Sequence, residues 1–312
     1  MVPPSRSSPA PSRRDFLRAA ATAATALSFP RLARAASPAG PIPIIGSAES
    51  FRFLETRELA QFASVAGWTG LEASVRKAGQ IDPSHVRDDL PDFFNAVQQH
   101  GLDMPALATD LFTLRDPDAE GVLRTAAKLG IKRVRLGTWK YDAAKPRDPQ
   151  LAIIVRDLRE LGQLAKEIDI KLGVENALRS DRFGSDVRDL VDVIKQSGQD
   201  IGIYFNPARA ILVHGSAAPQ AALAESRLMG AYAEDYLPLG LSPNHQPKAC
   251  ELGMGVSQPA FFKDLRASGF GGIVCIRYEY ALGKNEAILK HARTDLATLQ
   301  QWLGQYSPSP FL

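Results

Sequence analysis

The chain is poor in the residues and segments that mark several protein classes. Among its 312 residues are only two cysteines, Cys250 and Cys275, which are too few for a disulfide-stapled scaffold. Cys275 lies in an apolar run, where we expect a buried free thiol. Beyond the N-terminus, no apolar segment approaches the length of a membrane-spanning helix. We therefore expect a soluble protein that folds without disulfides and does not insert stably into a membrane.

The first 35 residues have the features of a twin-arginine (Tat) export signal. Arg13 and Arg14 precede an alanine-rich apolar stretch over 19–29, and the small-x-small run 33–35 suits cleavage before Ala36. The stretch is too short to span a bilayer stably. We expect the Tat machinery to export the protein to the periplasm or beyond, leaving 36–312 as the mature chain. The alternative is a disordered basic N-terminus.

The basic character of the chain belongs mostly to this leader. The whole chain has a formal charge of +3, whereas residues 1–35 hold six arginines and one aspartate, a net of +5, so 36–312 carries −2. A mildly acidic mature chain does not favour a nucleic acid or an anionic membrane as a partner.

A short apolar, β-branched run followed by a turn and a helical pattern recurs eight times between about residues 42 and 304. Apolar residues over 148–168 recur with the 3.6-residue period of a helix. Strands that alternate with helices favour parallel pairing through right-handed crossovers. The count of eight predicts an α/β fold, a single (β/α)8 TIM barrel over 36–312, with a doubly wound open sheet as the alternative. The expected strands are Ile42–Gly46, Gly70–Val75, Met104–Thr109, Arg133–Gly137, Lys171–Asn176, Ile201–Asn206, Met229–Asp235 and Gly272–Tyr280.

The functional residues of a TIM barrel lie at or just after the carboxyl ends of its strands. Glu175 and Glu279 stand at the ends of the expected fifth and eighth strands, after apolar residues that should point inward. Buried carboxylates must meet cations, metals or water, because an unpaired buried charge is costly. We therefore expect these two glutamates to be catalytic. Other strand ends supply the candidate substrate-binding residues Glu72, Arg76, Trp139, Lys140, Asn206, Tyr232 and Asp235.

Several motifs, in their order along the chain, resemble the xylose isomerase-like superfamily, and in particular Tat-exported bacterial sugar phosphate isomerase/epimerase proteins. The motifs span nearly the whole mature chain. They lie at 70–79, 89–91, 123–133, 173–176, 252–255 and 278–280. The resemblance implies a TIM barrel that acts on a small-molecule carbohydrate.

The resemblance also implies a divalent-metal site, because the superfamily usually holds Mn²⁺, Mg²⁺ or Zn²⁺ with a Glu, an Asp, a His and a Glu after the fifth to eighth strands. The two glutamates correspond to Glu175 and Glu279, but Asn206 replaces the Asp and Tyr232 stands near the His position. Arg209 stands where a sugar-binding His is often found. A neutral amide and a guanidinium weaken a site that depends on anionic oxygens. We expect metal binding by Glu175, Glu279 and Asn206 to be weak or absent, and we expect no organic cofactor.

The first function compatible with these residues is that of a sugar isomerase or epimerase. Glu175 and Glu279 would move a proton next to a carbonyl. Arg209, assisted by Lys140, would replace the metal in stabilising the enediolate.

The second compatible function is that of a non-catalytic carbohydrate-binding barrel. Its pocket would be lined by aromatic rings, with Arg209 holding a carboxylate or phosphate. The expected rings are Trp139, Tyr232, Tyr278 and Tyr280.

A third function, that of a metal-dependent hydrolase like the abasic-site endonucleases, is disfavoured. Such sites need several His and Asp ligands, and of five histidines only His214 and His245 lie in expected loops. His245 could replace a metal ligand, but its place between Pro243 and Pro247 fits a solvated loop residue. The acidic mature chain argues further against a DNA substrate.

Overall fold

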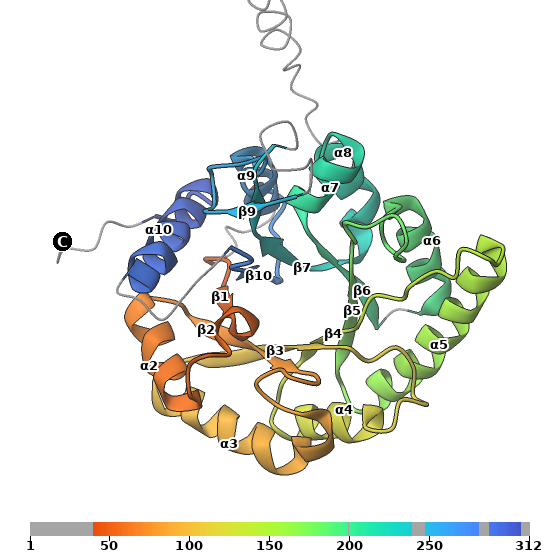
Figure 1. Cartoon of the computed structure of the whole chain (residues 1–312), viewed down its shortest axis with the longest axis horizontal. Coiled ribbons are helices and arrows are strands. Elements are labelled where there is room, and N and C mark those ends of the chain that lie inside the picture. The colour runs from red at the N-terminus through yellow and green to blue at the C-terminus, as the bar shows by residue number, and fades with distance from the viewer. Residues whose placement is uncertain (1–39, 199, 239–246, 281–286, 307–312) are drawn as a thin grey trace, which may run out of the picture. The chain divides into compact units, whose positions relative to one another are not determined.

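Eight parallel strands close into a barrel in the computed structural model, which describes residues 40–198, 200–238, 247–280 and 287–306 (Figure 1). The strands lie around the barrel in the order β1-β10-β7-β6-β5-β4-β3-β2, which confirms the predicted TIM barrel. The strands are β1 (Ile44–Ser47), β2 (Gly70–Val75), β3 (Asp103–Thr109), β4 (Arg133–Arg135), β5 (Lys171–Glu175), β6 (Ile201–Phe205), β7 (Leu228–Ala233) and β10 (Ile273–Ile276). The predicted leader, 1–35, lies outside the described residues.

Helices form an outer ring around these strands (Figure 1). The longest of the described helices, α5, covers Arg147–Glu167, close to the predicted 148–168. It buries Ile154, Leu158 and Leu161, members of the apolar series seen in the sequence. The other α-helices are α2 (Thr56–Ala66), α3 (Val86–Gln99), α4 (Ala119–Lys128), α6 (Val187–Ser197), α7 (Pro207–His214), α8 (Ala218–Ala224), α9 (Pro259–Ala267) and α10 (Ala287–Trp302).

The seventh barrel strand is shorter than predicted. It ends at Ala233, and the next residues form the antiparallel hairpin of β8 (Asp235–Tyr236) and β9 (Ala249–Cys250). The carboxylate of Asp235 stabilises this turn of the chain, because it accepts four hydrogen bonds of 2.8–2.9 Å from backbone N–H groups. The donors are Tyr236, Gly253, Gly255 and Ser257. Asp235 therefore organises a loop beside the barrel.

The eighth barrel strand is also shorter than predicted. It pairs with β1 and β7 only over Ile273–Ile276, so Arg277 and Glu279 lie beyond its carboxyl end. The side chains of Arg277 and Glu279 therefore need not alternate between the two faces of the sheet, as they would within a strand.

Close approach of neighbouring strands fills the barrel interior around Tyr204. Its ring lies against Gly173 of β5 and Gly230 of β7, and a Cβ atom at either glycine would collide with it. The Tyr204 and Tyr232 rings lie 5.6 Å apart. The interior is thus filled by side chains, as expected for a barrel of eight strands.

Both cysteines are free, and Cys275 is buried in β10, as the sequence predicted. Cys250 is half-buried. Among the described helices, none is both long and apolar enough to cross a membrane.

Candidate functional site

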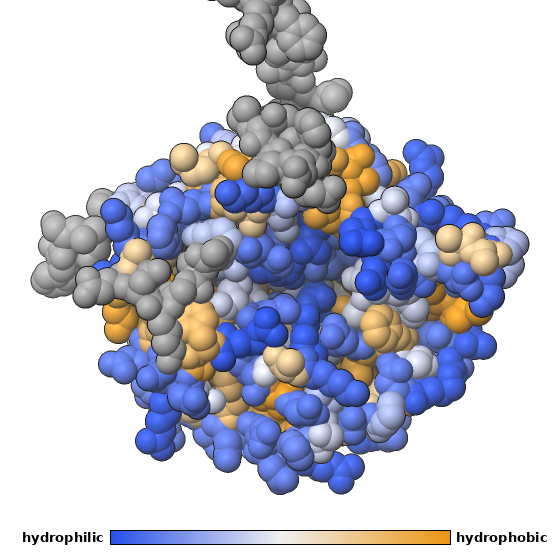
Figure 2. Space-filling model, viewed as in Figure 1, coloured by the Kyte–Doolittle hydropathy of each residue, from blue (hydrophilic) through white to orange (hydrophobic). Residues whose placement is uncertain are grey.

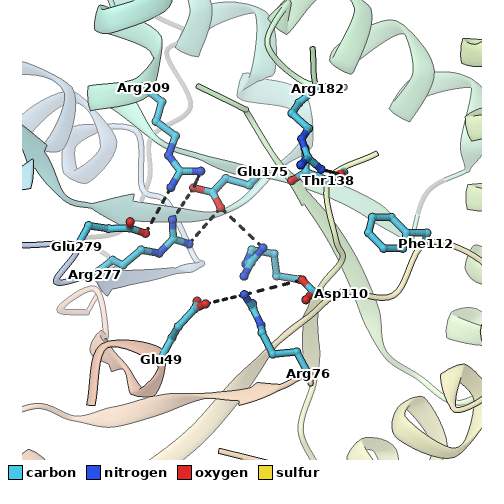
Figure 3. Close-up of a pocket in the computed structure, with 11 residues that line it drawn as sticks. Glu49, Arg76, Asp110, Phe112, Thr138, Glu175, Arg182, Arg209, Arg277 and Glu279 are labelled. Carbon is cyan, nitrogen blue, oxygen red and sulfur yellow. Dashed lines mark hydrogen bonds and ion pairs between the residues drawn. The ribbon is translucent and has the colours of Figure 1, made fainter. Parts of the chain in front are cut away.

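A pocket of about 420 Å³ opens where the strands end, and its walls are mostly charged (Figure 3). Figure 2 shows hydrophilic side chains around a hollow near the centre of the face viewed in Figure 1. Five arginines and four acidic residues line the pocket: Arg76, Arg135, Arg182, Arg209 and Arg277, with Glu49, Asp110, Glu175 and Glu279. The pocket is therefore built for a polar ligand.

Glu175, the last residue of β5, is the centre of a buried cluster of ions. It accepts hydrogen bonds from both terminal nitrogens of Arg277, at 2.9 and 3.1 Å. A terminal nitrogen of Arg209 lies 3.1 Å from Glu175, and one of Arg135 lies 3.9 Å away. Burial raises the pKa of Glu175, but Arg209, Arg277 and Arg135 together outweigh it and hold this pKa well below its ordinary value. Glu175 is thus an anchor for guanidinium groups and a weak base.

A second buried carboxylate, Glu234, completes the cluster. Glu234 follows β7 and accepts hydrogen bonds from Arg209 Nε at 2.8 Å and from the Tyr236 hydroxyl at 3.0 Å. Its other oxygen accepts from Arg277 at 3.3 Å. Glu234 and Glu175 therefore hold Arg209 and Arg277 jointly from two strand ends.

Asn206 supports this cluster as a hydrogen-bond donor. It caps the N-terminus of α7, where its carbonyl oxygen accepts from the backbone N–H of Arg209 at 3.1 Å. Its amide nitrogen donates to Glu175 at 3.1 Å and to Glu234 at 2.6 Å. Both ends of the Asn206 side chain are thus engaged, and the cap fixes the start of the helix that carries Arg209.

The guanidinium of Arg277 stacks on an aromatic ring. Its guanidinium carbon lies 3.7 Å from the centre of the Tyr232 ring, a stacked cation–π contact. The Tyr232 hydroxyl donates to Glu72 at 2.6 Å inside the barrel. Tyr232 and Glu72 are buried beneath the pocket and do not line it.

The residues present do not fit a divalent cation at the predicted position. Three guanidiniums lie within 4 Å of Glu175, and at an effective dielectric constant of about 20 each would repel a unit positive charge by on the order of 4 kcal/mol. The carbonyl oxygen of Asn206 is used by a backbone N–H. Within the described ranges no three His, Cys, Asp or Glu residues are grouped to hold a metal. The guanidinium of Arg277 takes the place that a cation would have between Glu175 and Glu234.

Glu279 differs from the buried carboxylates. Its side chain is 44% exposed, and its Oε1 lies 3.7 Å from a terminal nitrogen of Arg209. Burial raises the pKa of Glu279, and the negative charge of Glu234 raises it further. Figure 3 shows Glu279 and Arg209 on the same side of the pocket. Glu279 therefore combines access to a ligand with a raised affinity for a proton.

The structure brings four of the sequence-predicted site residues into contact: Glu175, Asn206, Arg209 and Glu279. Arg76 also lines the pocket, where it pairs with Glu49 at 2.6 Å. Glu72, Tyr232 and Asp235 lie outside the pocket lining, in contrast to the substrate-binding position expected for them.

Trp139 and Lys140 are also absent from the lining of this pocket. Trp139 packs edge-on against Phe112 and Phe183. Lys140 is exposed and lines a separate cavity of about 560 Å³ with Tyr141, Asp142, Ala143 and Asp181. It is therefore not placed to assist Arg209.

The aromatic lining expected for a sugar-binding pocket is absent from the described part of this pocket, where Phe112 is the one aromatic ring. Tyr278 stacks on Trp68, with ring centres 5.8 Å apart, and Tyr280 donates to Asp295 at 2.8 Å. His245 lies outside the described residues. The described lining of the pocket is thus mostly charged, whereas the sequence suggested aromatic rings on which a sugar could stack.

Sequence reasoning missed Arg135, Arg182, Glu234 and Arg277 as site residues. Glu234 and Arg277 stand directly after the apolar ends of β7 and β10, so their position carried a signal. That signal was ambiguous because a charged residue at such a position can also be a rim salt bridge. Arg182 lies seven residues beyond the end of β5, and nothing in its spacing distinguishes it from the neighbouring Arg179.

Solved structures of other proteins, two of them sugar epimerases, share this fold. A D-psicose 3-epimerase from Clostridium cellulolyticum H10, with D-tagatose, is 14% identical with a TM-score of 0.66, over 84% of this chain and 99% of that chain. A 3-keto-D-glucoside 4-epimerase from E. coli is 17% identical with a TM-score of 0.65, over 84% of this chain and 100% of that one. The IOLI protein with a bound zinc atom is 16% identical with a TM-score of 0.69, over 86% of this chain and 100% of that one.

At these identities the likeness to solved structures establishes the fold alone. No curated protein sequence matches the chain. The sequence profile of the xylose isomerase-like TIM barrel family, however, matches residues 60–303, most of the chain. The protein therefore belongs to the xylose isomerase-like TIM barrel family.

Proposed function

We propose that this protein is a metal-independent carbohydrate isomerase, in which Glu279 moves a proton between carbons next to a carbonyl. The observation that carries the proposal is the pairing of Glu279 with Arg209 across 3.7 Å at the pocket wall. An accessible carboxylate with a raised pKa suits general acid–base chemistry. The sugar epimerases with the same fold support a carbohydrate as the substrate.

Arg209 has the role that a metal commonly has in such reactions. When Glu279 removes a proton from carbon, the electron pair passes toward the carbonyl oxygen and an enediolate forms. A fixed cation beside that oxygen stabilises the charge, and little reorganisation is needed because Glu175 and Glu234 already hold Arg209 in position. Glu279 then delivers the proton to the former carbonyl carbon, and the proton of the adjacent hydroxyl group passes to the former carbonyl oxygen. The carbon that carried the hydroxyl becomes the new carbonyl, and no oxidant or reductant is consumed.

The use of one base favours isomerisation over epimerisation. A single carboxylate can return the proton to the adjacent carbon on the same face of the enediolate, whereas inversion at one carbon requires delivery to the opposite face. Glu175, the partner predicted from the sequence, is engaged by two guanidiniums at 2.9–3.1 Å, and its lowered pKa makes it a poor base. We therefore assign Glu175 to holding the arginines and Glu279 to the chemistry.

Exchange of carbon-bound hydrogen with solvent tests this assignment. The purified protein, treated with a chelator, is incubated in D₂O with aldoses, ketoses and their carboxylated derivatives, and deuterium in the recovered sugars is measured by mass spectrometry. We expect exchange by the natural protein and a loss of about 10²–10⁴-fold in Glu279→Gln. Asp110→Asn, at an exposed acid of the same pocket, is the matched control. Undiminished exchange in Glu279→Gln would contradict the proposal.

A non-catalytic carbohydrate-binding barrel is the second candidate, because Glu175 is fully committed to ion pairs. The same experiment separates the two functions. Binding of a sugar with no deuterium incorporation and no change of the sugar, even at high protein concentration, would favour the binding protein.

We further propose that residues 1–35 direct Tat-dependent export. The supporting feature is the order of the twin arginines, the apolar stretch and the cleavage site in the sequence. Replacement of Arg13 and Arg14 by lysine should retain the precursor in the cytoplasm in a fractionation experiment. Unchanged export of that variant would contradict the proposal.

A further inference from the structure

Three guanidiniums surround two carboxylates in the buried ion cluster. Arg135, Arg209 and Arg277 have side-chain exposures of 8, 17 and 4%, and the two carboxylates among them, Glu175 and Glu234, are 3 and 1% exposed. A third buried carboxylate, Glu72, is engaged by the Tyr232 hydroxyl, and Glu279 lies 3.7 Å from Arg209. Arg135 is left with the weakest pairing, and because a poorly compensated buried charge is costly, a further anion at the pocket would stabilise it.

Arg135 is the least compensated of the three. Its closest carboxylate oxygen, on Glu175, is 3.9 Å away and is shared with Arg277, which lies much closer. One terminal nitrogen donates to the Leu136 carbonyl at 3.3 Å, and Nε has no hydrogen-bond partner. Arg135 lines the pocket, so an anion in the pocket can approach this guanidinium.

Arg182 adds a fourth guanidinium at the pocket wall. It lines the pocket on the side away from Glu279 in the view of Figure 3 and donates to the Thr138 carbonyl at 3.1 Å. No carboxylate of the described residues forms an ion pair with it, whereas Arg179 in the same loop pairs with Asp181 at 3.0 Å. The hydrogen bond to Thr138 holds Arg182 at the pocket wall.

We propose that the ligand is an anionic carbohydrate, whose carboxylate or phosphate group is held by Arg182 and Arg135. Carboxylate and phosphate share the arrangement of two or more oxygens that a guanidinium fork binds through paired hydrogen bonds. With the anionic group held by Arg182 and Arg135, the sugar carbons extend toward Arg209 and Glu279. This placement of the sugar carbons rests on the proposed isomerase function, whereas the recognition of the anionic group does not depend on it.

Calorimetric titration of the full-length protein with four probes tests this recognition: D-glucuronate, D-gluconate, D-glucose 6-phosphate and neutral D-glucose. We expect at least one anionic probe to bind at least tenfold more tightly than D-glucose. A preference for the two carboxylates or for the phosphate identifies the anionic group. Equal affinity for D-glucose, or no heat of binding with any anionic probe at 10 mM, would overturn the proposal.

Variants locate the site of recognition. Arg182→Gln and Arg135→Gln should each weaken binding of the preferred anion by about tenfold or more and reduce its preference over D-glucose. Arg182→Lys should recover part of the loss because it restores the charge without the fork. The matched control is Arg179→Gln, at a 74% exposed arginine of the same loop, which should bind as the natural protein does. Full anion affinity in both Gln variants would contradict the assignment.

Failure of this proposal can be told from failure of the proposed function. Binding of anionic sugars without deuterium exchange would leave the charge recognition intact and remove the isomerase. Deuterium exchange into neutral sugars, with no preference for anionic sugars, would support the isomerase function and overturn the charge recognition. Thermal unfolding of each variant without ligand confirms that a lost affinity reflects the site and not the fold.

Discussion

Arg277 and Glu175 face each other through two parallel hydrogen bonds of 2.9 and 3.1 Å, at the ends of strands β10 and β5. This paired geometry gives both strength and orientation. At the position where the family resemblance implies a metal ligand, this carboxylate instead binds a guanidinium. Arg209 is fixed by the same carboxylate and by Glu234, and it lies beside Glu279.

Neutralising Glu175 should destabilise the protein strongly. In Glu175→Gln, Arg209 and Arg277 would keep Glu234 as a partner, whereas Arg135 would lose its ion pair. Removal of one member of a buried ion cluster costs about 3–5 kcal/mol of unfolding free energy. Urea unfolding measures the change. Glu167→Gln is the control, since Glu167 is 63% exposed and pairs with Arg124 at the surface, where the loss should stay below about 1 kcal/mol. Equal costs for the two variants would contradict the central role of Glu175.

Removing the hydroxyl of Tyr232 should leave Glu72 poorly satisfied. Tyr232→Phe keeps the ring beneath Arg277 and deletes the 2.6 Å hydrogen bond to Glu72, whose other donor is the Cys275 thiol at 3.8 Å. A buried acceptor that loses its partner costs about 1–3 kcal/mol. Chemical unfolding should show this loss, whereas Tyr306→Phe, at a 43% exposed tyrosine, should show almost none. A neutral Tyr232→Phe would mean that Glu72 finds another donor.

The contribution of Asp295 to the stability of the fold should fall as pH rises from about 4 to 6. Burial raises the pKa of this carboxyl from 3.8 to about 6, although Tyr280 and the Leu252 N–H donate to it. The folded state therefore keeps its proton where the unfolded chain has lost it, and this contribution, on the order of 3 kcal/mol, is present at low pH and lost across that window. Asp295→Asn should remove this part of the pH dependence. Parallel stability–pH curves for the two proteins would contradict the assignment.

Catalysis should depend on pH with the opposite sign. Glu279 must be ionised to remove a proton, so turnover should decline as pH falls through its pKa, which lies above the ordinary value for glutamate because of burial and Glu234. The profile of kcat/KM against pH reports this pKa for the free protein. Glu234→Gln removes the neighbouring negative charge and should move the acidic limb to lower pH, whereas an unmoved limb would assign it to another group.

The fold could be predicted from the sequence because its signal is repeated. Eight apolar runs alternate with helical patterns, and the period over 148–168 matched α5 to within a residue at each end. The ends of β7 and β10 could not be predicted equally well. The four backbone hydrogen bonds that turn the chain at Asp235 form with residues up to 22 positions away, which local pattern does not reveal.

The site could be predicted in part. Glu175, Asn206, Arg209 and Glu279 converge because the barrel gathers strand ends, and this follows from topology. Which charges pair within the barrel depends on distances between different strands. The sequence could therefore indicate that Arg209 disfavours a metal, but it did not reveal that Arg277 lies between Glu175 and Glu234.

The most direct test of this account is the metal content of the purified protein. The protein is prepared without chelators, soaked separately with Mn²⁺, Mg²⁺ and Zn²⁺, desalted, and analysed by elemental mass spectrometry. The guanidinium cluster predicts well below one retained ion per chain, with deuterium exchange unchanged by a chelator. About one ion per chain, lost in Glu175→Gln or Glu279→Gln, would contradict the account, because it would show that the carboxylates release their arginines to bind a metal.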